Sequence, residues 1–229
     1  MIARLSRLTL ATGAAAAAMA SALTLGAVPA QAYTLSSNLF ASVNLNGTLA
    51  YGNGVTGVTH LGTGQYEVTF SADVQQCAYV ATTVNAYSQA LQVFTAGGHL
   101  SADGVYVETK NQGGGLSAGI SFHLAVICPS AASTTVAVVA ANGRIARGSR
   151  HTWSFSLAPG QYTLVTSRPL FGCAAIATRG SIDTAVPYDP ATVEIVPGAT
   201  RHTVGIQVRQ LLFSGGNLAS ESFHTALVC

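Results

Sequence analysis

One serine lies in a pattern that is typical of a catalytic nucleophile. Residues 115–119 (GLSAG) match G-x-S-x-G, in which a sharp strand-to-helix turn exposes the serine, and an acid and a histidine follow in the chain. The available partners are Asp183, Asp189, His202 and His224. However, residues 120–128 have the pattern of a strand, and the partners fall in the other half of the chain. We predict that Ser117 lies in a glycine-rich hairpin loop, which leaves a Ser117 hydrolase as the less favoured alternative.

Histidines and a second glycine pattern are the other features that could serve a cofactor or metal. Residues 52–57 (GNGVTG) match G-x-G-x-x-G, but dinucleotide binding needs a helix to begin there, and residues 58–70 predict two strands joined by a turn. A zinc site needs two or three converging ligands. Of the six histidines, only His123 and His224 occupy equivalent places in the two halves, and we expect both on the less buried side of a strand. We predict no cofactor, metal or catalytic site.

An internal repeat organises most of the chain. A shift of 96 positions aligns residues 46–82 with 142–178 without a gap, and 14 of these 37 positions are identical. Ser-Phe-His then leads to cysteine in both halves, at an offset of 101. We predict a signal peptide (1–32), module 1 (33–128), a short linker (129–132) and module 2 (133–229).

The four cysteines favour a disulfide framework, because they lie about fifty residues apart with no C-x-x-C pair. Spacing alone leaves three pairings open. The repeat gives each module one early and one late cysteine, so it predicts the pairs Cys77–Cys128 and Cys173–Cys229. We expect them to join the second and last strands of each module.

Alternating apolar residues predict short strands throughout both modules. In module 1 the sequence 65–70 alternates Tyr66, Val68 and Phe70 with polar residues, and in module 2 Trp153, Phe155 and Leu157 alternate in the same way. Gly, Asn and Pro clusters separate these runs, and no window after residue 32 has helical periodicity. We predict an all-β fold of two tandem β-sandwich-like modules, each closed by one disulfide.

The N-terminus and the charge limit where the protein acts. Arg4 and Arg7 precede an apolar, alanine-rich stretch, and residues 29–32 (PAQA) supply a cleavage signature before Tyr33. We expect a secreted protein, extracellular or associated with the cell wall, with no membrane span after cleavage. Eight basic and eight acidic residues then remain, and this neutral balance argues against nucleic acid as a partner.

The few charges are unevenly divided between the modules. Module 1 has four acidic residues and one lysine, whereas module 2 has seven arginines and four acidic residues. Arg144, Arg147 and Arg150 cluster just after the linker. This cluster is either chance scatter among few charges or a patch that contacts the other module or a partner. If copies of the chain pair head to tail through such patches, the pairing can propagate into open assemblies.

Three segments of module 1 resemble a known type of module. Residues 62–70 (GTGQYEVTF), residues 77–82 (CAYVAT) and the Phe-His-Leu segment before Cys128 are similar to repeat modules of secreted, uncharacterised proteins of Gram-positive actinobacteria. A looser likeness is to the β-sandwich tips of phage tail fibres. Module 2 departs from this pattern at Thr166, Ala175 and Thr225. The resemblance implies an exported β module and transfers no activity.

These features favour a non-catalytic pair of modules that binds or coats at the cell envelope. Two tandem modules suit bivalent attachment to a repeating polymer such as a cell-wall polysaccharide, or to a surface protein. The candidate ligand contacts are the tyrosines Tyr51, Tyr87, Tyr106 and Tyr188. The alternatives are a self-assembling structural surface protein, a protein inhibitor that presents a loop, and the Ser117 hydrolase.

Overall fold

A computed structural model of the chain describes residues 39–84, 91–111, 113–117, 120–129, 134–185, 191–210 and 217–229. The regular elements in these ranges are all β-strands, and the described residues belong to one compact unit, Tyr33–Cys229. Within the same ranges, no helix has the length and apolar character needed to cross a membrane. The predicted signal peptide, Tyr87, Tyr188 and residues 130–132 of the predicted linker lie outside the described residues.

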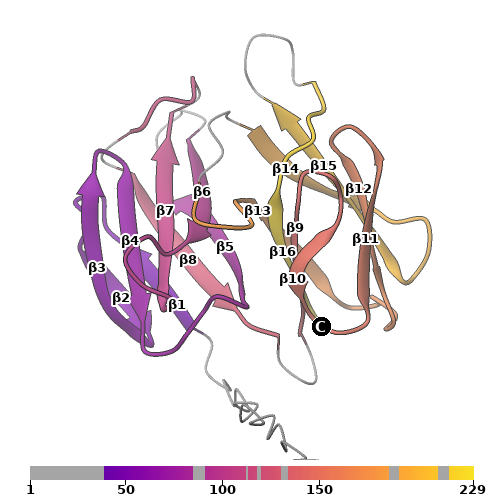
Figure 1. The fold of residues 1–229 in the computed structure, drawn as a ribbon, viewed down its shortest axis with the longest axis horizontal. Helices are drawn as coiled ribbons and strands as arrows, with labels where there is room; N and C mark the ends of the chain where they lie inside the picture. Colours follow the sequence, from indigo (N-terminus) through magenta and orange to yellow (C-terminus); the bar gives the residue numbers. More distant parts are fainter. Residues whose placement is uncertain are drawn as a thin grey trace, which may run out of the picture. The chain divides into compact units, whose positions relative to one another are not determined.

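The first sandwich, β1–β8, consists of two four-stranded antiparallel sheets (Figure 1). One sheet has the strand order β2-β1-β8-β5 and the other has the order β3-β4-β7-β6. The strands are β1 (Leu39–Val43), β2 (Leu49–Asn53), β3 (Val55–Gly62), β4 (Gln65–Phe70), β5 (Ala78–Val84), β6 (Gln92–Gly97), β7 (Gly104–Lys110) and β8 (Ser121–Ile127).

The second sandwich, β9–β16, repeats this topology with every strand number raised by eight. Its sheets have the orders β10-β9-β16-β13 and β11-β12-β15-β14, and Figure 1 shows it in orange to yellow. The strands are β9 (Thr134–Val139), β10 (Ile145–Gly148), β11 (Thr152–Ala158), β12 (Gln161–Thr166), β13 (Ala174–Arg179), β14 (Ala191–Pro197), β15 (Thr203–Gln210) and β16 (Phe223–Val228). The predicted all-β fold of two sandwich-like halves is confirmed.

Each sandwich has its own apolar core between its two sheets. In the first, Tyr66, Val68 and Phe70 of β4 are buried against Phe122 and Leu124 of β8, as their alternation predicts. The equivalent core of the second sandwich is centred on side chains of β12, β15 and β16. Because inward positions recur every second residue, period-two patterning located these strands correctly.

On β11 the alternating apolar residues face away from the core, unlike those on β4. Trp153, Phe155 and Leu157 lie on one side of the strand, but they face away from the core and are 55%, 47% and 64% exposed. The expectation that these residues form a half-buried face is therefore wrong. Alternation predicts a strand but does not say which of its two sides meets the core.

Both predicted disulfides are confirmed, Cys77–Cys128 and Cys173–Cys229. In each sandwich the early cysteine directly precedes the fifth strand, β5 or β13, and the late one directly follows the last strand, β8 or β16. These are neighbouring strands of one sheet. The expectation that the disulfide joins the second strand is wrong, because four strands come before the early cysteine in each sandwich, so the strand after it is the fifth.

The turn between β3 and β4 requires glycine at its centre. Gly64 has φ of 65°, and a Cβ built there lies 2.7 Å from the carbonyl oxygen of Thr109 and 2.8 Å from that of Ser117. Gly160, its repeat equivalent, has φ of 66° and is equally enclosed by backbone. We expect Gly64→Ala to lower the free energy of unfolding by about 2 kcal/mol or more, because both the conformation and the space exclude a side chain. Denaturant unfolding measures this, with Gly113→Ala as the control, and equal stability of the two variants contradicts the account.

Candidate functional site

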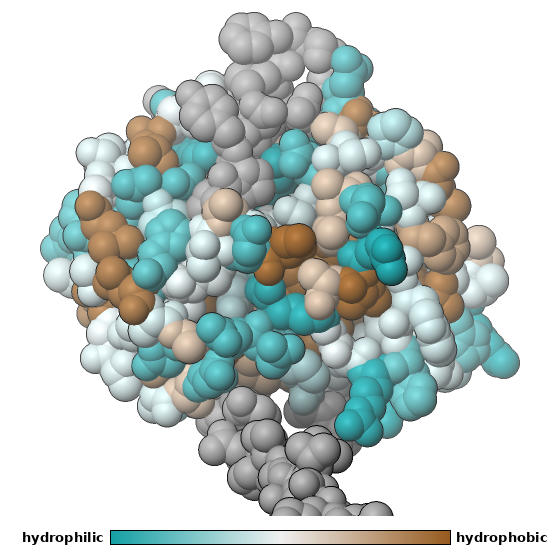
Figure 2. Space-filling view, viewed as in Figure 1, coloured by the Kyte–Doolittle hydropathy of each residue, from teal (hydrophilic) through white to brown (hydrophobic). Residues whose placement is uncertain are grey.

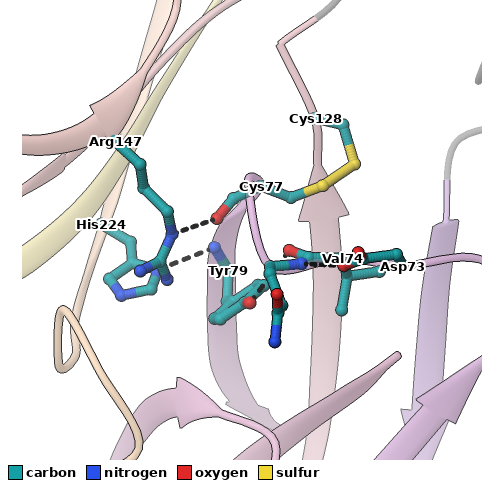
Figure 3. Close-up of a disulfide and its surroundings, with 8 residues drawn as sticks. Asp73, Val74, Cys77, Tyr79, Cys128, Arg147 and His224 are labelled. Atoms are coloured by element: carbon teal, nitrogen blue, oxygen red, sulfur yellow. Dashed lines mark hydrogen bonds between the residues drawn. A yellow bond between two sulfur atoms is a disulfide. The ribbon is translucent and has the colours of Figure 1, made fainter. Parts of the chain in front are cut away.

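The two sandwiches meet where the edge of β5 faces the sheet β10-β9-β16-β13. The backbone N–H of Tyr79 donates to Nδ1 of His224 at 2.9 Å, and Nε2 of His224 donates to the carbonyl oxygen of Ser181 at 2.7 Å. Figure 3 shows His224 and Arg147 reaching from the second sandwich toward Tyr79 and Cys77. The duplicated histidine thus holds the two halves together.

Two further side chains of the second sandwich contact the same edge of β5. Thr178 Oγ1 accepts from the N–H of Ala81 at 2.9 Å and lies 3.1 Å from the carbonyl oxygen of Ala81, to which it donates. Arg147 Nε donates to the carbonyl oxygen of Cys77 at 3.1 Å, and its guanidinium lies 5.3 Å from the centre of the Tyr79 ring. These contacts to β5 go to main-chain atoms of alternate residues, so the sheet recognises β5 by its backbone.

Apolar packing and a β-bridge between β6 and Gly180 complete this contact. Ala78, Val136, Val138 and Ala226 form a buried cluster between the sandwiches. Beside it, Thr95 of β6 forms a parallel bridge with Gly180, and its carbonyl oxygen accepts from Ser181 N–H at 2.9 Å. The two halves therefore share a buried interface.

Burial determines the charge state of the histidine in this interface. His224 is fully buried, and desolvation, with a smaller effect of Arg147, lowers its pKa from 6.5 to about 3. A neutral ring fits its partners, since Nδ1 must accept and Nε2 must donate. The expectation that His224 lies on a less buried side is wrong, because the other sandwich covers that side. His123 is exposed as expected.

Next to this interface is a groove of about 580 Å³, which we call the inter-sandwich groove. One wall is the outer face of the sheet β2-β1-β8-β5, and the other is formed by β13 and β14. Side chains or backbone of the following residues line it: Phe40, Ala41, Ser42, Tyr51, Val80, Ala81, Thr82, His123, Leu124, Ala125, Ala175, Ile176, Ala177 and Ile195. Its size falls within the range of small-molecule sites.

Aromatic rings line the first wall of the groove. Tyr51 is 57% exposed and makes edge-to-face contacts with Phe40 and His123, at ring-centre distances of 6.4 Å and 6.1 Å. Ser42, Thr82 and His123 supply hydroxyl and imidazole groups among these rings, and none of the lining residues carries a carboxylate, ammonium or guanidinium. The groove can therefore bind an uncharged ligand through apolar contact and a few hydrogen bonds.

The other sequence-predicted contact residues are not in the groove. Tyr106 is 3% exposed, its hydroxyl lies 3.0 Å from Glu108 Oε1, and its ring stacks on His99. Burial, with Glu108 adding to the effect, raises the pKa of Tyr106. The expectation that Tyr106 is an exposed ligand contact is wrong, because its side of β7 is covered. Tyr87 and Tyr188 lie outside the described residues.

Ser117 lies in a loop that pairs with β7. Its N–H donates to the carbonyl oxygen of Thr109 at 2.9 Å, and its own carbonyl oxygen accepts from Thr109 Oγ1 at 2.8 Å. Of its possible partners, His224 and Asp183 are held at the interface, where Asp183 accepts from the Ser181 hydroxyl. The structure therefore does not bring Ser117 together with these two residues.

The arginine cluster divides in the structure. Arg147 is at the interface, where burial lowers the pKa of its guanidinium, whereas Arg144 and Arg150 are exposed. Within the described ranges, the salt bridges Lys110–Glu108, Arg179–Glu221 and Arg209–Glu194 each join residues of one sandwich. Between the halves, Arg147 instead donates to the carbonyl oxygen of Cys77, and the guanidinium of Arg179 lies 5.7 Å from the centre of the Phe94 ring.

Sequence reasoning missed most of the groove and found only Tyr51. Phe40 and Ser42 lie on β1, for which the sequence predicts no strand, and Thr82 stands out in the sequence only as a repeated position. The repeat itself holds the missing signal. Positions that are shifted by 96 or 101 from the interface residues Arg147, Thr178 and His224 are Tyr51, Thr82 and His123.

Exposed apolar side chains also lie outside the groove, among them Trp153, Phe155 and Leu157 on β11. Figure 2 shows hydrophobic side chains in several separate groups among hydrophilic and neutral ones on the face in view. In the part of the chain that the structure describes, no group of three or more His, Cys, Asp or Glu residues is arranged to hold a metal ion.

Comparisons with protein families, with curated proteins and with solved structures found no match.

Proposed function

We propose that this chain is an exported, non-catalytic binding protein of the cell envelope or extracellular space, and that the inter-sandwich groove is its ligand site. The observation that carries the proposal is the row of Phe40, Tyr51 and His123 along one wall of the groove. Exposed aromatic side chains beside an apolar cavity are typical of recognition sites. The two disulfides support an extracellular setting.

Three kinds of observation favour binding over catalysis. The residues that line the groove include no Asp, Glu, Lys or Arg. His123 is the one imidazole among them, and no carboxylate lies beside it in the groove to complete a general acid–base pair. The buried carboxylate of Glu67 has a structural role, because it accepts backbone N–H groups of His99 and Leu100 at 2.8 Å and 3.0 Å. His224 is neutral and enclosed.

The test is co-sedimentation of the mature, oxidised protein with purified cell walls that keep their attached proteins, and with insoluble polysaccharides. We expect retention on one of these that changes little with salt, since the groove carries no formal charge. Tyr51→Ala is expected to weaken binding about tenfold, because the exposed ring supplies apolar contact in the groove.

Trp153→Ala is the matched control, since Trp153 is as exposed as Tyr51 but lies on β11 and not in the groove. We expect it to bind like the wild type. Equal binding by Tyr51→Ala and the wild type contradicts the groove as the site. No retention on any envelope material contradicts the proposed function itself.

A second candidate is a self-assembling surface protein, which the exposed Trp153, Phe155 and Leu157 favour. These side chains form an apolar stripe on β11, the edge strand of its sheet, and such edges promote association. Concentration-dependent sedimentation that persists at high salt and is lost in Phe155→Ser supports this candidate. Association lost at high salt instead supports pairing through the opposite charges of the two halves.

A further inference from the structure

We infer that the inter-sandwich groove binds an extended polypeptide strand of a partner protein, recognised by its backbone. This inference rests on the groove being the ligand site. Its basis is that the chain contains a second, equivalent surface that is already occupied by a strand, which we call the filled face. There the outer face of β10-β9-β16-β13 contacts an extended strand, β5, through hydrogen bonds to its N–H and carbonyl groups.

The recognition groups of the filled face have equivalents in the groove. Thr178 and His224 are opposite each other on β13 and β16, and Thr82 and His123 are opposite each other on β5 and β8. Both of the latter line the groove and are exposed. His123 and Thr82 can therefore contact two alternate N–H groups of a strand, as His224 and Thr178 do.

The opposite wall of the groove is a strand edge. β13 is the last strand of its sheet, and its register on β16 matches the register of β5 on β8. Ala175 and Ala177 are thus equivalent to Tyr79 and Ala81, whose N–H groups point away from the sheet to which they belong. Both alanines line the groove.

An extended strand bound in the groove can form main-chain hydrogen bonds with both walls at once. One of its edges adds to β13 as a fifth strand of β10-β9-β16-β13, and its other edge faces His123 and Thr82. Addition of a strand to a free sheet edge is a common mode of peptide binding, in which main-chain hydrogen bonds supply affinity. A glycan has no alternating N–H and carbonyl groups to match this edge, so the arrangement favours polypeptide.

Three residue differences between the groove and the filled face determine which side chains of a bound strand fit in the groove. Phe40, Ser42 and Tyr51 in the groove replace Val136, Val138 and Arg147 of the filled face, as their repeat positions and strand pairing show. On the filled face, the small side chain of Ala78 packs against the two valines. The groove accordingly selects a strand with small apolar side chains on the side that faces Phe40 and Tyr51.

The probe is the chain's own segment 76–83 with Cys77→Ser, made as a labelled synthetic peptide, because this is the strand that the filled face binds. Fluorescence anisotropy with the oxidised mature protein is expected to show saturable binding. N-methylation at the positions of Tyr79 and Ala81 removes the two N–H donors and is expected to weaken binding at least about tenfold. A single N-methyl group at residue 83 is the peptide control.

The protein variants test the groove directly. We expect His123→Ala and Thr82→Val each to weaken peptide binding about three- to tenfold, since each removes one hydrogen bond. His202→Ala and Thr192→Val are the matched controls outside the groove, and they are expected to bind like the wild type. Unchanged binding of the N-methylated peptide, or of both groove variants, overturns the inference.

The outcomes separate this inference from the proposed function. If the peptide does not bind, while wall retention depends on Tyr51 and soluble glycan competes it away, the groove binds glycan and only the strand inference fails. If wall retention is also independent of Tyr51, the groove is not a ligand site and both fail. A concentration-dependent dimer that is lost in His123→Ala identifies the strand as part of a second copy and overturns the assignment to a partner protein.

Discussion

Replacing Cys77 and Cys128 together with alanine is expected to lower the free energy of unfolding by about 4 kcal/mol. The disulfide closes a loop with a sequence separation of 51, and in the chain-entropy model such a cross-link restricts the unfolded chain by about this amount. The loss is a large share of the ~5–15 kcal/mol that stabilises a typical domain. It also releases the start of β5, the strand that the second sandwich binds.

Two probes of denaturant unfolding measure this effect. Circular dichroism reports on both sandwiches, whereas fluorescence of Trp153, the single tryptophan, reports on the second. We expect the midpoint by circular dichroism to fall below the midpoint by fluorescence in this variant. The matched variant with Cys173 and Cys229 replaced by alanine is expected to lower the fluorescence midpoint. A first-sandwich variant as stable as the wild type contradicts the account.

Acid is expected to destabilise the interface through His224. The pKa of this histidine is about 3 in the folded protein and about 6.5 when unfolded, so the unfolded chain binds the extra proton between these values. Stability is therefore complete above pH 6.5 and falls as the pH drops toward 3. At pH 4.5, two units below the unfolded pKa, the expected loss from this group is about 3 kcal/mol.

His224→Asn is the variant that isolates this effect, because asparagine cannot be protonated and can still accept the N–H of Tyr79. It is expected to be less stable than the wild type at pH 7.5 by about 1–3 kcal/mol, through the altered contact to Ser181. Its stability should then fall less steeply with acid. Parallel pH profiles of the two proteins contradict the buried, neutral state of His224.

The repeat and the alternation of apolar residues were enough to predict the fold class. Cys77–Cys128 and Cys173–Cys229 followed from one early and one late cysteine in each copy, and Tyr66, Val68 and Phe70 are inward as predicted. The strands that the sequence did not reveal are those at the start of each copy. There β2 is exposed at every position and leaves no periodic pattern to read.

The candidate site was less predictable because it depends on how the two copies pack. Equivalent residues have different environments, since His123 is exposed and His224 is fully buried. The same Ser-Phe-His segment nevertheless leads to the late cysteine in both copies. Only the contact between β5 and the second sandwich distinguishes them, and that contact has no periodicity in the sequence.

The most direct test of the groove as the binding site is methyl NMR of isoleucine-labelled protein during titration with soluble fragments of cell walls that keep their attached proteins. Ile176 and Ile195 line the groove, whereas Ile145 and Ile206 pack in or against the core of the second sandwich. The account predicts saturable shifts of the Ile176 and Ile195 methyl signals, with those of Ile145 and Ile206 unchanged. Binding that leaves Ile176 and Ile195 unperturbed contradicts it.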